Sequence, residues 1–322
     1  MNITVVGGAG YVGSVLCPML DKGKDVNLKV IDTFWFWKNK KEYRKLFASG
    51  SSVELIEHDI RENLDEHLDG SDVVINLACI SNDISSDLDP SFTHDVSYNG
   101  VMNVIKGCER LGIRRLIQVS SGSVYGVKET PVREGTHEEP ITQYAVIKME
   151  IDHYLQHLMK SGNHDITILR PATIYGRSPR QRLDLMLNIF AHKVANGEPI
   201  VVHGGQQSRP SLHVKDISGA IVQMIADARS YNQVYNISKE AMSVLEYAKI
   251  FEKMYGVEII VEDVNDARSW RTDSEKMYRD LGIIHRTQLE SGIQELVDSF
   301  RENDVDTDYS VNMKVIKRLL CR

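Results

Sequence analysis

Apolar segments of strand length alternate with longer helical patterns through the first 175 residues of the chain. The expected strands are almost continuously apolar, as strands are when helices cover both faces of their sheet. They lie at residues 3–6, 28–31, 53–57, 73–76, 116–120 and 166–169. The intervening helices are expected at residues 13–20, 91–111 and 142–160. Because crossovers between parallel strands are right-handed, this order predicts an α/β fold with a doubly wound parallel sheet.

The pattern is less regular after Arg170-Pro171. We expect a helix at 182–196, a loop-rich stretch around Gly204 and Gly205, and a helix capped by Asp216 that ends near residue 228. Shorter elements are expected at 234–237, 243–255, 257–261 and 288–300. The prediction is a large domain at 1–170 that the chain rejoins at 212–237, and a smaller mixed α/β substrate domain at 171–211 and 238–322. The pattern assigns no role to the basic end at 313–322.

Gly7, Gly10 and Gly13 follow the first expected strand with the spacing G-x-x-G-x-x-G and open the first helix. Glycines in such a turn let the backbone approach a pyrophosphate, whose charge then lies at the helix N-terminus. Asp32 ends the next expected strand, where a carboxylate can hydrogen-bond a ribose diol and repel a 2′-phosphate. The pattern predicts a Rossmann dinucleotide site that prefers NAD to NADP.

Tyr144 and Lys148 are four residues apart in an expected helix, so their side chains face the same way. A nearby ammonium favours the phenolate and is expected to lower the pKa of the tyrosine, as suits a general base. Tyr–Lys pairs at this spacing also occur on solvated helix faces. The serine-rich segment Ser120–Ser123 follows a buried strand and places hydroxyls at the carboxyl edge of the sheet, where such folds bind ligands.

With these motifs in this order, the chain resembles the extended short-chain dehydrogenase/reductases, the nucleotide-sugar epimerase/dehydratase family, over nearly its whole length. The resemblance implies NAD as cofactor, Ser121, Tyr144 and Lys148 as catalytic residues, and Asn99 as a support of the active-site helix. It implies that the cofactor contacts Gly7, Gly10, Tyr11, Val12, Asp32, Asp59, Ile60, Leu77, Ala78, Tyr144, Lys148 and Pro171. It implies that a nucleotide-diphosphate-sugar contacts Ser121, Ser123, Tyr144, Arg209 and Arg271.

The resemblance places Arg209 against the nucleotide diphosphate, with Arg268 or Arg271 as the candidate second phosphate contact. A solvated surface arginine is the alternative for those two.

Dehydratases and decarboxylases that resemble this chain carry acidic residues directly after the catalytic Ser or Thr, and certain 3,5-epimerase/reductases carry a Cys at the position of Ser123. This chain has Gly122 and Ser123 there. Transient C4 oxidation by an epimerase is therefore the leading hypothesis, and a nucleotide-sugar 4-dehydrogenase or ketoreductase is the alternative. A non-catalytic dinucleotide-sensing regulator is a more remote one.

Composition excludes several partners. The formal net charge of −7 gives no general attraction to nucleic acid or to an anionic membrane. Four widely spaced cysteines without a C-x-x-C pair indicate no metal site, and no apolar run is long enough to span a bilayer. No signal-like segment precedes the first strand, so a cytoplasmic protein is expected.

Two expectations concern surfaces. The helices at 91–111 and 142–160 carry apolar residues beyond one face, and in the family these helices pair with their copies in a four-helix bundle, so a homodimer is expected. Those residues are Val101, Val104, Ile105, Ile147, Ile151, Leu155 and Leu158. The aromatic segment Phe34–Trp37 can cover the adenine ribose, form a contact surface, or pack locally.

Overall fold

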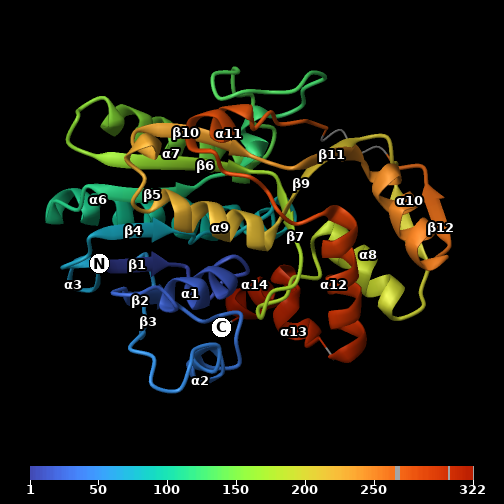
Figure 1. Ribbon diagram of the computed structural model, residues 1–322, viewed down its shortest axis with the longest axis horizontal. Coiled ribbons are helices and arrows are strands. Elements are labelled where there is room, and N and C mark those ends of the chain that lie inside the picture. Colours follow the sequence, from blue (N-terminus) through green and yellow to red (C-terminus); the bar gives the residue numbers. More distant parts are fainter. Residues whose placement is uncertain (265–268, 304, 322) are drawn as a thin grey trace.

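A seven-stranded sheet in which every neighbouring pair is parallel forms the centre of the computed structural model, which describes residues 1–264, 269–303 and 305–321 (Figure 1). The strand order is β10-β6-β5-β4-β1-β2-β3, so the chain winds outward from β1 in two directions. The strands are β1 (Asn2–Val6), β2 (Asn27–Asp32), β3 (Glu54–Glu57), β4 (Val73–Asn76), β5 (Arg115–Val119), β6 (Asp165–Pro171) and β10 (Gln233–Ile237). The predicted doubly wound α/β fold is confirmed.

Both faces of this sheet are covered because successive strand residues point to opposite sides. Val5 belongs to the cluster that packs under α1 (Gly13–Asp21) and α9 (Val214–Met224), and Val6 to the cluster on the other face. That other face is covered by α6 (Val101–Leu111) and α7 (Gln143–Met159). The chain preceding α6 forms α5 (Pro90–His94) and a π-helix, η1 (Asp95–Gly100), instead of one uninterrupted helix.

The apolar residues that suggested a dimer face are buried inside the subunit. Six of them are at most 2% exposed and pack on the sheet: Val101, Val104, Ile105, Ile147, Ile151 and Leu155. Leu158 is partly buried against the same cluster. The expectation that these side chains extend beyond the core-facing side is therefore wrong, since the sheet itself covers them.

Shorter helices complete the large sheet layer. They are α2 (Lys40–Arg44), α3 (Asp65–Leu68), α4 (Asp83–Ser86), and the 3₁₀ turns η2 (Gly122–Tyr125) and η3 (Ala228–Ser230). No helix in the described part of the chain is long and apolar enough to cross a membrane.

The second half adds a smaller layer of mixed structure, drawn on the right of Figure 1. Its three-stranded sheet has the order β11-β9-β7, and a parallel pair joins β12 to β8. The strands are β7 (Thr173–Tyr175), β8 (Ile200–His203), β9 (Ser208–His213), β11 (Glu240–Ser243) and β12 (Ile259–Glu262). The helices α8 (Met186–Ala195), α10 (Val244–Tyr255) and α12 (Leu289–Glu302) share one apolar core. A smaller mixed α/β part therefore accompanies the Rossmann sheet, as predicted.

Two helix starts differ from the expectation. Helix α8 begins at Met186, because Arg182 and Asp184 pair with one another in a loop. Helix α9 begins at Val214 with His213 as N-cap, whereas Asp216 lies inside the first turn and accepts hydrogen bonds from the backbone of residues 286 and 287.

The range 238–322 does not stay with the smaller part. Helix α11 (Glu275–Leu281) contacts β10, and its Met277 and Leu281 join the core under the large sheet. The C-terminal helices are α13 (Thr307–Ser310) and α14 (Asn312–Leu320), and α14 contacts α4 beside the large sheet. The apolar faces of α11 and α14 therefore pack against the large domain. The chain crosses between the two parts more often than the predicted domain boundaries imply.

Candidate active site

One cavity of about 690 Å³ lies across the carboxyl ends of the central strands and extends beneath the smaller part. Every residue expected to contact the cofactor lines it, and so do Ser121, Ser123 and Arg209. These residues come from segments spread over two hundred positions of the chain. Among the described residues, the fold therefore brings the predicted cofactor and substrate residues other than Arg271 to a single cavity.

The glycine-rich turn is shaped for close backbone approach. Gly7 has φ +77°, and a Cβ there would lie 2.6 Å from the backbone nitrogen of Ala78, so a side chain cannot be accommodated. A Cβ on Gly13 would collide with the Gly8 carbonyl. Helix α1 begins directly after this turn without a side-chain cap. The Ser14 and Val15 N–H groups donate to the carbonyls of Gly10 and Val12, so the donors left for an anion are the N–H groups of residues 11–13, which have no acceptor within the described part of the chain.

Asp32 lies at the end of β2, beside this turn. One carboxylate oxygen accepts from the Ala9 N–H at 2.9 Å and the other from the Phe34 N–H at 2.8 Å. Burial raises the pKa of Asp32 to about 6, although these backbone hydrogen bonds oppose the rise. Each oxygen retains a lone pair for a ribose hydroxyl, so the residues present fit the adenosine half of NAD.

Tyr144 and Lys148 occupy the first two turns of α7, which Thr142 caps through a hydrogen bond from the Ala145 N–H. Lys148 donates from Nζ to the carbonyl of Val119 at 3.0 Å, and the same atom lies 5.8 Å from the centre of the Tyr144 ring. The Lys148 ammonium therefore lies beside the Tyr144 side chain, at the carboxyl end of β5.

The pKa of Tyr144 is raised, because burial outweighs the opposing effects of the Lys148 charge and a side-chain hydrogen bond with Ser121. The Lys148 charge thus lowers the pKa of the tyrosine as expected, but in the protein without ligands it does not offset the effect of burial. Burial also lowers the pKa of Lys148, but contacts with Cys79 and Tyr144 outweigh it and the pKa is raised. The lysine is held in its charged form.

Ser121 caps η2, with its hydroxyl accepting from the Ser123 N–H at 3.1 Å and lying 2.8 Å from the Ser123 hydroxyl. Neither of the two residues after Ser121, which are Gly122 and Ser123, is acidic. A Cβ at Gly122 would lie 3.2 Å from the carbonyl oxygen of Pro171, so η2 packs closely against the end of β6.

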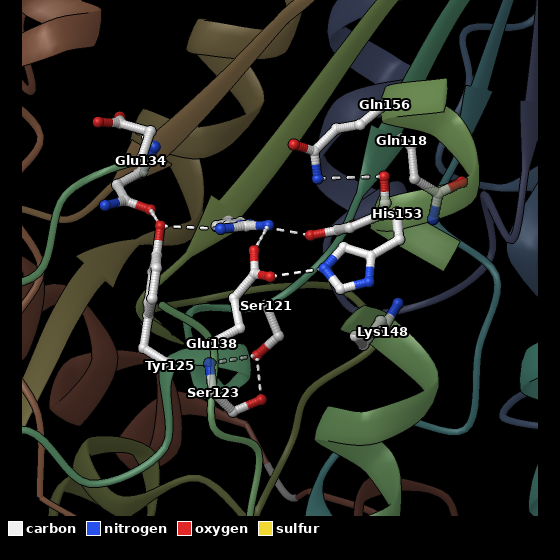
Figure 2. Close-up of polar contacts among 12 residues, drawn as sticks. Gln118, Ser121, Ser123, Tyr125, Glu134, Glu138, Lys148, His153 and Gln156 are labelled. Atoms are coloured by element: carbon white, nitrogen blue, oxygen red, sulfur yellow. Dashed lines mark hydrogen bonds and ion pairs between the residues drawn. The ribbon is translucent and has the colours of Figure 1, made fainter. Parts of the chain in front are cut away.

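A largely buried ionic network lies beside α7 (Figure 2). Arg170 in β6 is 2% exposed and donates from Nε to Asp152 at 2.8 Å and from Nη1 to the Tyr125 hydroxyl at 3.0 Å. It also pairs with Glu138, which contacts His153 at 2.6 Å. Asp152 is on α7, one turn after Lys148, so the network ties this helix to the sheet. Sequence reasoning missed Asp152, whose only signal was its four-residue spacing from the lysine.

Arg209 in β9 and Trp270 line the part of the cavity beneath the smaller part, where the substrate is predicted to bind. The Arg209 guanidinium lies 5.1 Å from the indole centre, and its Nη1 donates to the Ser208 carbonyl at 3.3 Å. Arg271 is exposed and does not line the cavity; its Nε donates to the Ser208 hydroxyl at 3.3 Å. Side chains alternate along this extended segment, and its inward positions belong to Trp270 and Thr272. Arg268 lies outside the described residues.

Asn99 also lies away from the cavity, and its amide donates to Asp95 at 3.3 Å on the surface. Two residues earlier, the Ser97 hydroxyl accepts from the buried N–H of Ile80, in the loop that lines the cavity. A π turn holds more residues than an α turn and so rotates the side chains that follow. Within η1 it is therefore Ser97, and not Asn99, whose side chain contacts the loop that lines the cavity.

Comparison with known proteins gives a consistent result. Residues 3–238 match the model of the "NAD dependent epimerase/dehydratase family". The chain is 29% identical over 265 residues to a Bacillus subtilis protein described as an uncharacterized UDP-glucose epimerase, covering 80% of this chain and 83% of that protein.

Solved structures agree with this comparison. A UDP-glucuronic acid 4-epimerase from Bacillus cereus, in complex with UDP-glucuronic acid and NAD, is 27% identical with a TM-score of 0.82 over 94% of this chain and 99% of that one. A UDP-glucose 4-epimerase from Thermotoga maritima shares the fold, with 24% identity and a TM-score of 0.83 over 94% and 99% of the two chains. With a matched family model that spans most of its length, the chain belongs to the NAD-dependent epimerase/dehydratase family.

Proposed function

We propose that the protein is an NAD-dependent epimerase that inverts C4 of a nucleotide-diphosphate-sugar through a transient 4-keto sugar. One observation carries the proposal: a single cavity holds the dinucleotide turn, the Ser121/Tyr144/Lys148 group and Arg209. The segment after Ser121 has no acid to eliminate water, which leaves oxidation and re-reduction as the chemistry that these residues support.

Tyr144 is the proton-transfer residue of this mechanism. Its phenolate takes the proton of the C4 hydroxyl as C4 is oxidised and returns it as C4 is reduced from the opposite face. Lys148 holds a positive charge beside the phenol, and Ser121 hydrogen-bonds the reacting oxygen. Bound NAD would accept the C4 hydrogen with its electron pair, return it, and add a positive charge near Tyr144.

The phosphate groups of the substrate provide its binding handle. A guanidinium can hold a diphosphate through two parallel hydrogen bonds, and Arg209 lies at the end of the cavity away from the glycine turn. Trp270 offers an aromatic face in the same region. Uridine diphosphate sugars are the natural first substrates to test, because the relatives described above are named for them.

The decisive experiment separates epimerisation from net oxidation or reduction. Purified protein is incubated with UDP-glucose, UDP-glucuronic acid and their N-acetylated analogues, with and without added NAD, and the C4 configuration is followed by NMR. Turnover without added cofactor and without net change in nicotinamide absorbance at 340 nm supports the epimerase. Stoichiometric cofactor reduction would instead support a 4-dehydrogenase, and NAD binding without turnover of any sugar would support a regulator.

We also retain the homodimer and the cytoplasmic location as proposals. Because the residues named first are buried, the dimer proposal now depends on the partly buried apolar side chains of η1, α6 and α7. These are Tyr98, Leu111, Tyr154, Leu158 and Met159. All four cysteines are free thiols, as is usual for proteins of reducing compartments. Light scattering that gives the single-chain mass of 36.5 kDa at micromolar concentration would contradict the dimer. Cell fractionation tests the location.

A further inference from the structure

Arg180 is a buried cation that has no carboxylate partner in the described part of the chain. Its side chain is 4% exposed, and its guanidinium lies 4.0 Å over the ring of Phe36. One terminal nitrogen donates to the neutral side chain of Asn312, and Nε has no hydrogen-bond partner. Burial, with repulsion from Arg182, lowers the pKa of Arg180 to about 9, although the more distant charges of Asp184 and Asp32 oppose the fall. An arginine in this state is missing an anion.

Other buried arginines show what complete satisfaction looks like in this protein. Arg170 and Arg182 pair with carboxylates. Arg115 has none, but its guanidinium donates five hydrogen bonds to carbonyl and hydroxyl oxygens. Arg180 makes one side-chain hydrogen bond, to Asn312. Its exceptional state is therefore a property of this position and not of buried arginines in this fold.

Arg180 lies at the end of the cavity that is lined by the glycine-rich turn and Asp32. The backbone N–H of Arg180 donates to the hydroxyl of Ser14 at 3.3 Å, in the first turn of α1, and Ser14 also contacts Ser178 at 2.9 Å. Phe36 follows Asp32 by four residues and, like Arg180, lines the cavity. The guanidinium thus lies where the N-terminus of α1 meets the end of β2.

We propose that Arg180 binds the pyrophosphate of the dinucleotide and that Asn312, the first residue of the C-terminal helix, is a positioning residue for it. The inference rests on the proposed function, since the anion is that of bound NAD. A phosphate would complete the hydrogen bonds of the guanidinium fork and offset the cost of burying a charge that has no ion-pair partner. The other dinucleotide anion, a 2′-phosphate, would have to approach the carboxylate of Asp32.

The C-terminal helix thereby becomes part of the cofactor site. The Asn312 amide donates to the carbonyl and hydroxyl of Ser81, both at 3.2 Å, in the loop that lines the cavity. One turn later, Ile316 packs with Ile80 and Trp35. The helix therefore holds Arg180 from one side and closes the cavity from the other, as suits an enzyme that keeps its cofactor through many turnovers.

The test is to replace Arg180 and measure ligand binding and stability separately. In Arg180→Met the affinities for NAD and ADP-ribose, measured by calorimetry, should fall at least about tenfold, as for loss of a charge-assisted hydrogen bond. Binding of adenosine, which has no phosphate, should stay within twofold. The melting temperature without ligand should be unchanged or higher, because the unpaired charge is gone. Arg177→Met, an exposed arginine in the same loop, is the matched control and should change nothing.

Asn312→Ala tests the positioning role and covers the case in which Arg180→Met does not fold. It should weaken NAD and ADP-ribose but not adenosine, and should have no further effect in the Arg180→Met background. NAD affinity within twofold of wild type in Arg180→Met, or a loss confined to NADP, would overturn the inference. Equal loss of adenosine and NAD together with a lower melting temperature would also overturn it, in favour of a structural role. Wild-type protein that binds no NAD would overturn the proposed function itself.

Discussion

Affinity for NAD should fall as the pH falls through about 6, because Asp32 must be ionised to accept hydrogen bonds from the ribose. The pKa of this carboxyl in the protein without ligand is raised by burial to about 6. Protonation of Asp32 competes with NAD below that pH, whereas above it the full affinity is present. The direction is thus loss of binding on acidification and a constant affinity between pH 7 and pH 8.

The magnitude follows from the same value. One pH unit below its pKa, about a tenth of the carboxyl groups are ionised, so the dissociation constant should be roughly tenfold higher at pH 5 than at pH 8. Calorimetric titrations of NAD at half-unit steps from pH 5 to pH 8 measure it. Asp32→Asn should bind NAD more weakly at pH 7.5 and lose the dependence.

His58 lines the same cavity and is a second titratable group, so His58→Gln is the control. This variant should keep the tenfold change. A wild-type dissociation constant that is constant from pH 8 to pH 5 would refute the reasoning. So would an Asp32→Asn variant that still shows the change, because the titrating group would then lie elsewhere.

The other predictions concern chemistry, stability and substrate binding. Tyr144→Phe should lose more than about a thousandfold in turnover while its NAD affinity, by calorimetry, stays within twofold; near-normal kcat would remove Tyr144 from the mechanism. Asp152→Asn leaves Arg170 without its fully buried partner and should cost about 3 kcal/mol in urea unfolding; unchanged stability would contradict the anchoring of α7. Arg209→Ala should raise KM for the best nucleotide-sugar strongly and Arg209→Lys should restore it in part, because a point charge lacks the guanidinium fork. An unchanged KM would place the diphosphate elsewhere.

Local pattern was enough to locate the central strands. The run Val73–Ile75 is apolar and β-branched, and β4 has the predicted bounds, Val73–Asn76. The glycine turn and Asp32 could also be predicted from the sequence. The turn has room only for glycine, and the position after β2 uses a carboxylate to accept backbone hydrogen bonds. Such features depend on neighbours in the chain, so the sequence alone predicts them.

Features that depend on distant partners were not predictable in this way. Helix α8 starts late because Arg182 and Asp184 engage each other and Arg182 also donates to Ser81, about a hundred residues earlier. Arg271 points outward because a backbone hydrogen bond from the Val132 N–H fixes its segment. The environment of Arg180 was likewise not predictable, because its side chain is buried against Asn312 of the C-terminal helix, 132 residues later in the sequence.

The last strand of the large sheet has a consequence for how the chain is made. β10 pairs with β6, but 61 residues (172–232) separate them in the sequence, and β6 would expose an unpaired edge until β10 has been synthesised. At about 5–20 residues per second this interval lasts roughly 3–12 s on the ribosome. A nascent chain arrested before residue 233 should therefore be protease-sensitive and recruit chaperones. The Rossmann sheet should become protected only when β10 has emerged, by which time β7, α8, β8 and β9 of the smaller part have also been made.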